Sequence, residues 1–140
     1  MGFNVLIVDD SGAMRKVIKK TIKISGFDVD NFYEAGNGKE ALEVLKDNWI
    51  DVVLTDINMP EMDGITFLKL LKEDETSQGL PVIVISTEKR EQKVQEAISS
   101  GASGYVKKPF RPEEIKNILT GVIGEEYARK DDEAIEECDF

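Results

Sequence analysis

The sequence contains no histidine and only one cysteine, Cys138. Without histidine, the chain lacks the commonest general base and the commonest protein ligand of transition metals, so a zinc enzyme or a Ser-His-Asp hydrolase is a poor candidate. A single cysteine excludes a disulfide within the chain, which is typical of proteins in a reducing compartment. We therefore expect a cytoplasmic protein whose chemistry depends on other side chains.

Membrane spans, secretory signals and a surplus of positive charge are also missing. No apolar run approaches the roughly 20 residues that cross a bilayer, and the first residues do not resemble a signal peptide. The net charge of -10 argues against nonspecific binding to nucleic acids. We therefore expect neither membrane insertion nor a nucleic-acid partner. The length of 140 residues is enough for one domain with a single hydrophobic core.

Apolar runs alternate with segments of helical spacing along the whole chain. The expected strands are 3–8, 29–34, 52–55, 81–85 and 105–106. Each is followed by apolar residues at helical spacing, within 14–22, 39–47, 65–71, 94–98 and 115–123. This order predicts an α/β fold in which helices cover both faces of a parallel sheet. The strand 29–34 is the most polar, which favours a position toward a sheet edge.

Single residues mark several helix ends. Gly26 is expected to stop the first helix, Asn37 to cap the second and Pro112 to begin the fifth. Val17 is expected on the apolar stripe of the first helix, and Ile98 in the fourth helix. From about residue 125 the composition becomes strongly charged. We expect one domain over 1–124, and an acidic tail or an extension of the last helix over 125–140.

Carboxylates stand directly after two of the expected strands. Asp9 and Asp10 follow the first strand, and Asp56 follows the third. Because ligands of such folds gather at the carboxyl ends of the parallel strands, we expect these three side chains to meet. Adjacent carboxylates repel each other unless a cation joins them, and an all-oxygen set of ligands suits Mg2+. Capping of the next helix by Asp10 or Ser11 is the structural alternative for the pair.

Asp56 is also a candidate nucleophile. A carboxylate beside Mg2+ can attack phosphorus and form an acyl phosphate, while the metal neutralises charge on the phosphoryl oxygens. A plain turn residue is the structural alternative. Lys108 follows the fifth strand, where it can pair with Asp56 or with a phosphoryl oxygen, whereas strand alternation points Lys107 the other way. Ser86, after the fourth strand, can donate its hydroxyl to a phosphoryl oxygen, with Thr87 as its rival.

Four segments contain these residues in order: VLIVDDS, LTDINMPEMDG, LPVIVIST and GASGYVKKPF. Over about residues 3–123 they resemble the receiver domain of two-component response regulators, and most of all its stand-alone chemotaxis members. The resemblance implies a flavodoxin-like fold, with five helices and a single doubly wound sheet of five parallel strands in the order 2-1-3-4-5. One departure is Ile57, where a tryptophan is expected. The only tryptophan, Trp49, precedes the third strand and is expected to report metal or phosphate binding poorly.

The resemblance also implies roles for the site residues. Asp56 would be the phosphoacceptor, and Lys108 would contact the phosphoryl group, with a cis peptide bond between Lys108 and the following proline. For Mg2+, the implied ligands are Asp10 directly, Asp9 largely through water, Asp56, and the backbone carbonyl of Asn58.

Further implied roles concern the switch and its timing. Ser86 would move toward the phosphoryl group, and Tyr105 would fill the space that it leaves; from the residues alone, Tyr105 is as readily a core residue. Asn58 and Glu88 would tune dephosphorylation. The face expected to differ between the two states, and so to bind a partner, includes Lys89, Gln92, Tyr105 and Lys107.

The implied function is a signalling switch and not an enzyme. A sensor histidine kinase, of the chemotaxis type, or a small phosphodonor would phosphorylate Asp56, and the group would be lost by autodephosphorylation. We expect no effector domain after residue 123, so a monomer would signal by phosphorylation-dependent protein contact, with the flagellar motor switch as the favoured target. A phosphatase is a further partner that the family allows. A phosphorelay intermediate, which passes its group to a histidine phosphotransfer protein, is the alternative.

Three other functions compete with this interpretation. A Mg2+-dependent phosphohydrolase with an aspartate nucleophile needs a second aspartate two residues later, where this chain has Asn58. A flavin-binding protein of similar fold needs a phosphate loop after the first strand, where Asp9 and Asp10 would repel phosphate. A receiver that acts only by binding, without phosphorylation, is the third, and the complete set of site residues argues against it.

Overall fold

A computed structural model describes the backbone of residues 2–130 and the side chains of residues 2–123. Within these residues, five strands alternate with five helices, as predicted. The strands are β1 (Phe3–Val8), β2 (Val29–Ala35), β3 (Val52–Thr55), β4 (Val82–Ser86) and β5 (Gly104–Lys107). The helices are α1 (Gly12–Ser25), α2 (Gly38–Asp47), α3 (Gly64–Glu73), α4 (Glu91–Ser99) and α5 (Pro112–Lys130). β1 and β3 have the predicted bounds.

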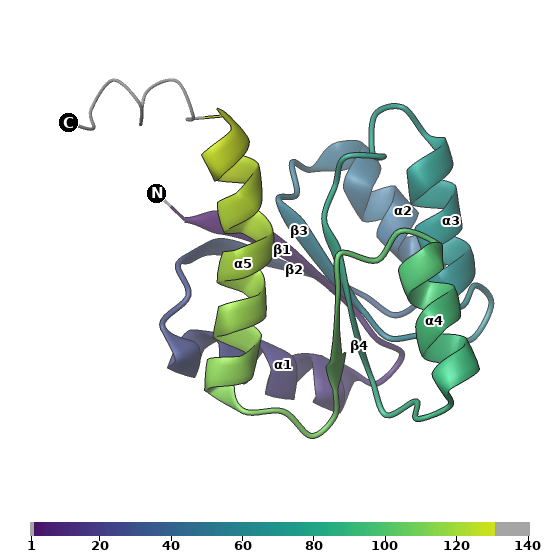
Figure 1. Cartoon of the computed structure of the whole chain (residues 1–140), viewed down its shortest axis with the longest axis horizontal. Helices are drawn as coiled ribbons and strands as arrows, with labels where there is room; N and C mark the ends of the chain where they lie inside the picture. The colour runs from purple at the N-terminus through teal and green to yellow at the C-terminus, as the bar shows by residue number, and fades with distance from the viewer. Residues whose placement is uncertain (1, 131–140) are drawn as a thin grey trace.

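The strands form one parallel sheet (Figure 1), and their order is β2-β1-β3-β4-β5, which is the order that the resemblance implied. β2 lies at an edge of this sheet, so the expectation for the most polar strand is confirmed. Val8 pairs with Thr55, and Ser86 pairs with Lys107. These registers bring the residues that follow β1 and β3, and those that follow β4 and β5, to the same end of the sheet.

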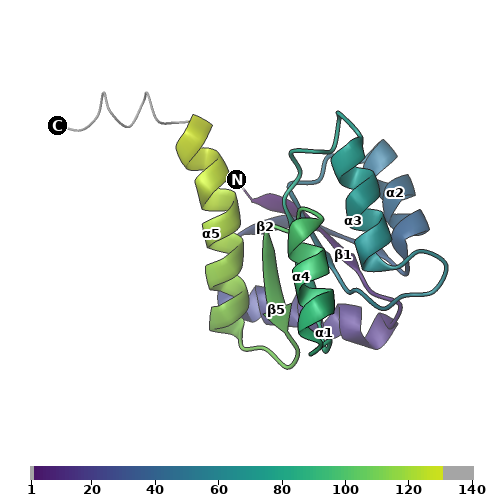
Figure 2. The ribbon, with the colours of Figure 1, turned by 45° about the vertical axis from the view of Figure 1, so that its right-hand side comes forward.

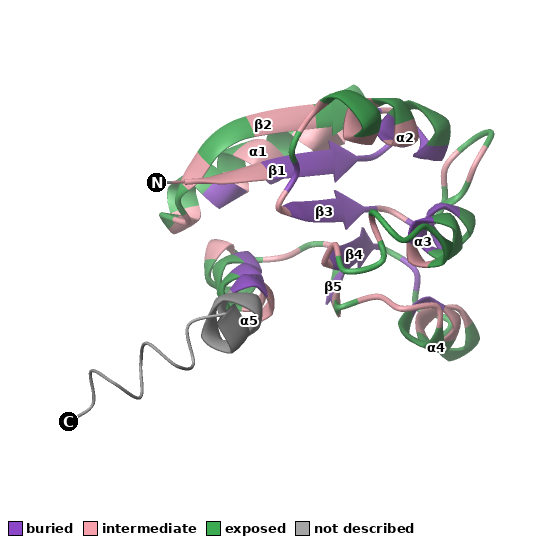
Figure 3. Ribbon diagram, turned by 90° about the horizontal axis from the view of Figure 1, so that it is seen from above, coloured by how far each residue is buried: buried purple, intermediate pink, exposed green. Residues whose placement is uncertain are grey.

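The helices form a layer on each face of the sheet, with α1 and α5 on one face and α2, α3 and α4 on the other (Figures 2 and 3). On the first face, Ile22 of α1 and Leu119 of α5 are fully buried. On the second, Phe67 of α3 is fully buried. Because β1, β3 and β4 are covered from both sides, each contains a continuous apolar run, over residues 5–8, 52–54 and 82–85, and not an alternating pattern.

The helix ends follow local hydrogen-bonding rules. Ser11 caps α1, with its hydroxyl accepting from the backbone N–H of Met14 at 3.1 Å. Gly26 ends this helix in the left-handed conformation, at φ 84°, and Asn37 caps α2. Both of these ends were predicted. Of the two capping candidates for α1, Ser11 therefore takes the role, which leaves the carboxylate of Asp10 free for another one.

Two apolar residues lie in the right helices but not on the buried stripe. Val17 is 51% exposed, so its predicted place on the apolar stripe is wrong, and Ile98, which lies in the fourth helix as predicted, is 47% exposed. Each precedes or follows a fully buried residue, Ile18 in α1 and Ala97 in α4. Because adjacent residues are turned by about 100° around a helix, only one of each pair faces the sheet.

α5 begins at Pro112, as predicted, and continues to Lys130. The expected domain end at residue 124 falls inside this helix and stays a prediction, and residues 131–140 of the expected acidic segment lie outside the described residues. None of the described helices combines the length and the apolar character needed to cross a bilayer.

Candidate functional site

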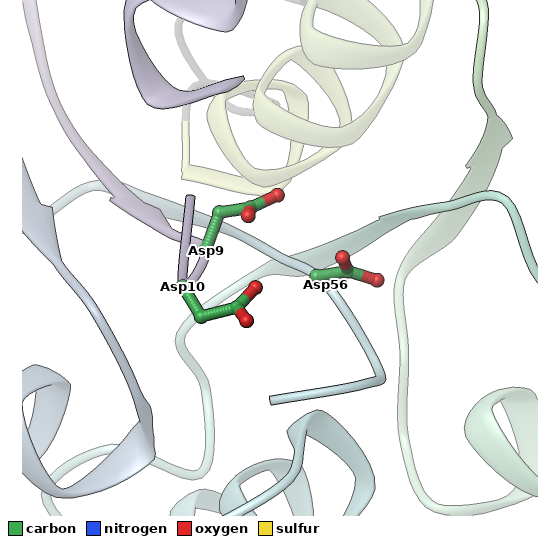
Figure 4. Close-up of side chains that lie close together, drawn as sticks. All are labelled: Asp9, Asp10 and Asp56. Atoms are coloured by element: carbon green, nitrogen blue, oxygen red, sulfur yellow. The ribbon is translucent and has the colours of Figure 1, made fainter. Parts of the chain in front are cut away.

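Three carboxylates meet at the carboxyl end of the sheet, as the sequence predicts. β1 leads directly to Asp9 and Asp10, and the neighbouring β3 leads to Asp56 (Figure 4). One oxygen from each of the three side chains lies within 4.8 Å of the others. Asp9 is nearly buried, Asp56 is partly buried and Asp10 is exposed. The cluster is therefore set into the protein on one side and open to solvent on the other.

Among the described residues, Lys108 is the one cation that forms an ion pair with the carboxylates of this cluster. Its Nζ donates to Asp9 Oδ2 at 2.9 Å and to Asp56 Oδ2 at 3.2 Å, and its side chain is only 9% exposed. Burial disfavours the charge, but the hydrogen bonds and the fields of Asp9 and Asp56 outweigh it and raise the pKa of Lys108. The predicted contact with Asp56 is confirmed. Lys107 is exposed, and Lys108–Pro109 is cis, as the resemblance implied.

The remaining carboxylate oxygens have few partners. Asp9 Oδ1 accepts from the backbone N–H of Ser11 at 2.9 Å, and Asp56 Oδ1 from that of Ile57 at 2.7 Å. Asp10 forms no side-chain hydrogen bond or ion pair with any described residue. Three carboxylates and one ammonium leave a surplus of negative charge, which a divalent cation relieves. Since all the ligand atoms are oxygens, the set fits Mg2+ better than a softer metal.

Ser86 ends β4 and is fully buried, whereas its rival Thr87 is exposed. The Ser86 carbonyl accepts from the backbone N–H of Lys108 at 2.9 Å, so the two candidate phosphoryl-binding residues are joined through the backbone. Its hydroxyl oxygen accepts from the backbone N–H of Glu88 at 3.1 Å. This arrangement leaves the hydroxyl proton for another acceptor, which is the Tyr105 hydroxyl oxygen while the site carries no phosphoryl group.

Tyr105, in β5, packs against a small cluster that contains Ile57 and Ala97, while its hydroxyl donates to the backbone carbonyl of Glu88 at 3.1 Å. Burial raises the pKa of Tyr105, although a hydrogen bond with Ser86 acts in the opposite direction. The ring is therefore partly a core residue, and its polar end reaches the loop beside the site.

The two positions implied to tune dephosphorylation differ strongly in their surroundings. Glu88 is nearly buried, and hydrogen bonds from the Arg90 side chain and backbone lower the pKa of Glu88 to about 2. Asn58 is exposed in the loop after Asp56. Their roles, like the other implied roles at this site, stay predictions.

Three of the four residues expected on the partner face are exposed: Lys89 before α4, Gln92 in α4 and Lys107 in β5. The fourth, Tyr105, is half-buried and lines a surface hollow between β5 and α5 together with Lys107 and Ile118. The four residues thus come from α4, the loop before it and β5, and α4 and β5 lie next to each other in Figure 2.

Sequence reasoning missed three residues that support the site. Arg15 in α1 donates from Nη1 to the backbone carbonyl of Asp9 at 2.6 Å. Arg90 binds Glu88. Gly64 lies so close to the Asp56 carbonyl that a Cβ added at Gly64 would be 2.0 Å from that oxygen. Only Gly64 has a signal in the sequence, because the pair Asp63–Gly64 marks a turn, but a turn does not indicate contact with the site.

Comparison with known proteins agrees with this geometry. The profile of the family described as response regulator receiver domain matches residues 5–120. The chain is 41% identical over 119 residues to chemotaxis protein CheY-3 of Vibrio cholerae, covering 85% of this chain and 90% of that protein. It is 39% identical over 121 residues to chemotaxis protein CheY1 of Helicobacter pylori, covering 86% and 96% of the two chains.

A solved structure shows the same fold. The chemotaxis response regulator CheY4 of Vibrio cholerae superposes with a TM-score of 0.74 and is 34% identical, covering 87% of this chain and 99% of that chain. The flavodoxin-like arrangement of five parallel strands is therefore shared with a known regulator across nearly the whole of that protein.

Proposed function

The chain belongs to the response regulator receiver domain family, and from this premise we propose that Asp56 accepts a phosphoryl group in a Mg2+-dependent reaction and that the chain then signals by binding another protein. The observation that carries the proposal is the cluster of Asp9, Asp10 and Asp56, two of which, Asp9 and Asp56, bind the Lys108 ammonium. A surplus of negative charge beside a lysine at the end of a sheet suits a cation and a phosphoryl group together.

The chain's own groups can perform the transfer without a general base. One carboxylate oxygen of Asp56 forms a bond to phosphorus while the bond from phosphorus to the donor breaks, and the leaving group departs with that electron pair. Lys108, which contacts Asp56 Oδ2 at 3.2 Å, provides positive charge beside the reacting carboxylate. Asp9, Asp10 and Asp56, with the carbonyl of Asn58, would hold Mg2+, which supplies charge neutralisation at the phosphoryl oxygens.

The new group then changes the local charge and hydrogen bonding. A phosphoryl group adds about 1.5 to 2 negative charges and three strong acceptors. The buried Ser86 hydroxyl has a proton to donate to it, and Tyr105 contacts both this serine's loop and the surface. The face formed by Lys89, Gln92, Tyr105 and Lys107 therefore differs between the two states, and a partner that binds one state better shifts the population toward it.

The relatives support the choice of partner. Two similar proteins are named as chemotaxis proteins, so we propose a sensor histidine kinase of the chemotaxis type as phosphodonor and the flagellar motor switch as target. In that role the chain is a monomeric cytoplasmic switch and not an enzyme that turns over a substrate. A phosphorelay intermediate is the second candidate, because the same site can return its group to a histidine.

The deciding experiment is the intact mass of the protein after incubation with acetyl phosphate, with Mg2+ and with a chelator. We expect one added phosphoryl group with Mg2+ only, and none in Asp56→Asn. Lack of an adduct in rapidly quenched samples, or an equal adduct in the variant, would reject Asp56 as the phosphoacceptor. Amide NMR signals of Lys89, Gln92 and Lys107 should respond to beryllofluoride, and unchanged signals would reject the proposed face.

A further inference from the structure

Glu88, in the loop between β4 and α4, has a described partner at each of its polar groups. Its backbone N–H donates to Ser86 Oγ, and its carbonyl accepts from Tyr105 Oη, both at 3.1 Å. Its carboxylate accepts from the backbone N–H groups of Lys89 and Arg90, also at 3.1 Å. One residue therefore joins the hydroxyl, the aromatic ring and the start of α4.

The carboxylate of Glu88 is covered by the side chain of Arg90. Arg90 Nε donates to Oε2 at 3.0 Å and Nη2 to Oε1 at 2.7 Å. The Arg90 side chain is 68% exposed while that of Glu88 is 8% exposed, so the guanidinium lies between the carboxylate and solvent. Two parallel charge-assisted bonds fix orientation as well as distance. Because an exposed ion pair adds little to stability, the main consequence of this one is positional.

We propose that Arg90 is a positioning residue of the switch, which acts through Glu88. This inference rests on the proposed function of Asp56. The ion pair holds the Glu88 carboxylate against the backbone N–H groups of its own loop. It thereby fixes the position of the Glu88 carbonyl, which accepts from Tyr105, and of the Glu88 N–H, which donates to Ser86. An ordered loop beside Ser86 also limits the access of water to a phosphoryl group on Asp56, and exclusion of water protects reactive intermediates from hydrolysis.

Loss of Arg90 leaves the Glu88 carboxylate with only its two backbone donors. The loop then becomes less ordered, Tyr105 loses its fixed acceptor, and water reaches the phosphoryl group more easily. We expect Arg90→Ala to raise the rate constant of phosphoryl loss about threefold or more, which is a modest lowering of the barrier. Arg90→Lys should restore the rate in part, since lysine keeps the charge but not the two parallel bonds.

The test follows the intact mass of the phosphorylated protein after removal of acetyl phosphate. Arg111→Ala is the matched control, because Arg111 is an exposed arginine near the same end of the sheet whose side chain has no ion pair within residues 2–123. A second background, Glu88→Ala, shows whether Arg90 acts through Glu88. There we expect Arg90→Ala to change nothing further.

Two results would overturn the proposal: a rate in Arg90→Ala equal to that of Arg111→Ala, or the same acceleration in the Glu88→Ala background. If the wild-type protein takes up no phosphoryl group, it is the proposed function that fails. The ring NMR signals of Tyr105 in the unphosphorylated protein then decide the role of Arg90. A clear shift in Arg90→Ala, absent in Arg111→Ala, supports it, and unchanged signals reject it.

Discussion

Polar side chains lie at both ends of the sheet, but the two ends differ in whether these side chains have enough hydrogen-bond and ion-pair partners within the protein. At the amino end, Asp51 accepts from the backbone N–H of Asn4 at 2.7 Å and from Trp49 Nε1 at 3.1 Å. The side-chain amide of Asn4 in turn donates to the Trp49 carbonyl at 2.8 Å. A single carboxylate is thus satisfied by neutral donors, and this end needs nothing from outside the chain.

At the carboxyl end, three carboxylates lie close together, two of them, Asp9 and Asp56, share the ammonium of Lys108, and Asp10 has no side-chain partner in the described part of the chain. Like charges at such short range are unfavourable unless a cation joins them. Aspartate therefore has a structural role at the amino end of the sheet, and at the carboxyl end it is a candidate ligand for a cation. The number of partners around each carboxylate marks the difference, and changes at the two ends should have different, sometimes opposite, effects.

The largest effect is expected from a change that displaces the carboxyl end as a whole. A Cβ at Gly64 would lie 2.0 Å from the Asp56 carbonyl oxygen, and backbone atoms cannot move away as a flexible side chain can. Gly64→Ala should destabilise the protein by about 3 kcal/mol, at the upper range for overpacking, and should weaken Mg2+ binding. Urea unfolding with a chelator measures the first effect, and a Mg2+ titration measures the second.

Gly121→Ala is the control for this change. Gly121 lies in α5, and a Cβ there would meet nothing within 4 Å. Alanine in a helix is more favourable than glycine by up to about 1 kcal/mol, so this variant should be as stable as the wild type or more so. Equal stability of Gly64→Ala and the wild type would show that the start of α3 is not packed against the backbone of Asp56.

Removal of the shared cation should have the next largest effect. Lys108→Met leaves Asp9 and Asp56 without a counter-charge, and we expect a loss of about 2 kcal/mol at neutral pH, below the cost of breaking a fully buried pair because Asp56 reaches solvent. Mg2+ should recover part of this loss, since it neutralises the same carboxylates. A loss that Mg2+ leaves unchanged would contradict a common role for the two cations.

The pH dependence of the same pair has a definite sign. The pKa of Lys108 is raised in the folded protein above its ordinary value of 10.5. Its contribution to stability is therefore complete below about pH 10.5 and is lost as the pH rises through the higher folded value. The difference in free energy of unfolding between the wild type and Lys108→Met should shrink in that alkaline range, as urea unfolding at several pH values would measure.

A change at the amino end should cost less and should not depend on metal. Asp51→Asn replaces a carboxylate oxygen by an amide nitrogen opposite an N–H donor, which removes one of its two hydrogen bonds. We expect a loss of about 1 kcal/mol, equal with Mg2+ and with a chelator, in urea unfolding followed by circular dichroism. A dependence on Mg2+ would mean that the two ends are not independent.

The sequence was sufficient to predict the strands and helices, which recur as periodic patterns, and the meeting of the carboxylates, which follows from the parallel pairing of the strands. The apolar runs predicted the strands. Asp9 comes directly after β1 and Asp56 directly after β3, so the register of β1 on β3 places the two residues next to each other. The helix caps at Gly26 and Asn37 were predictable for the same reason, since each depends on residues a turn away. Such features need only local spacing and the topology of the sheet.

Features that depend on precise approach in three dimensions were not predictable. The contact of Gly64 with Asp56 joins the backbone at the start of α3 to the backbone just after β3, and the bond between Arg90 and Glu88 forms in a loop without a periodic pattern. The exposure of Val17 depends on which side of α1 meets the sheet, and neighbouring apolar residues in a helix compete for that side. The second contact of Lys108, with Asp9, was likewise not predicted, because it depends on where the end of the lysine side chain lies and not on the Lys-Pro motif.

The smallest effect, and the one that separates the two ends most clearly, is expected at Asp10. Asp10→Asn keeps the shape of the side chain but removes one of three mutually repelling charges, so the variant should be more stable than the wild type by about 0.5 kcal/mol with a chelator, within the range for exposed charge pairs. With Mg2+ the order should reverse, because the wild type binds the ion better and is stabilised by that binding. Urea unfolding of both proteins in the two conditions makes the comparison, with Asp51→Asn as the matched substitution at the other end. A variant that is less stable than the wild type even with the chelator would mean that Asp10 is satisfied within the chain, and the carboxyl end would then be as self-sufficient as the amino end.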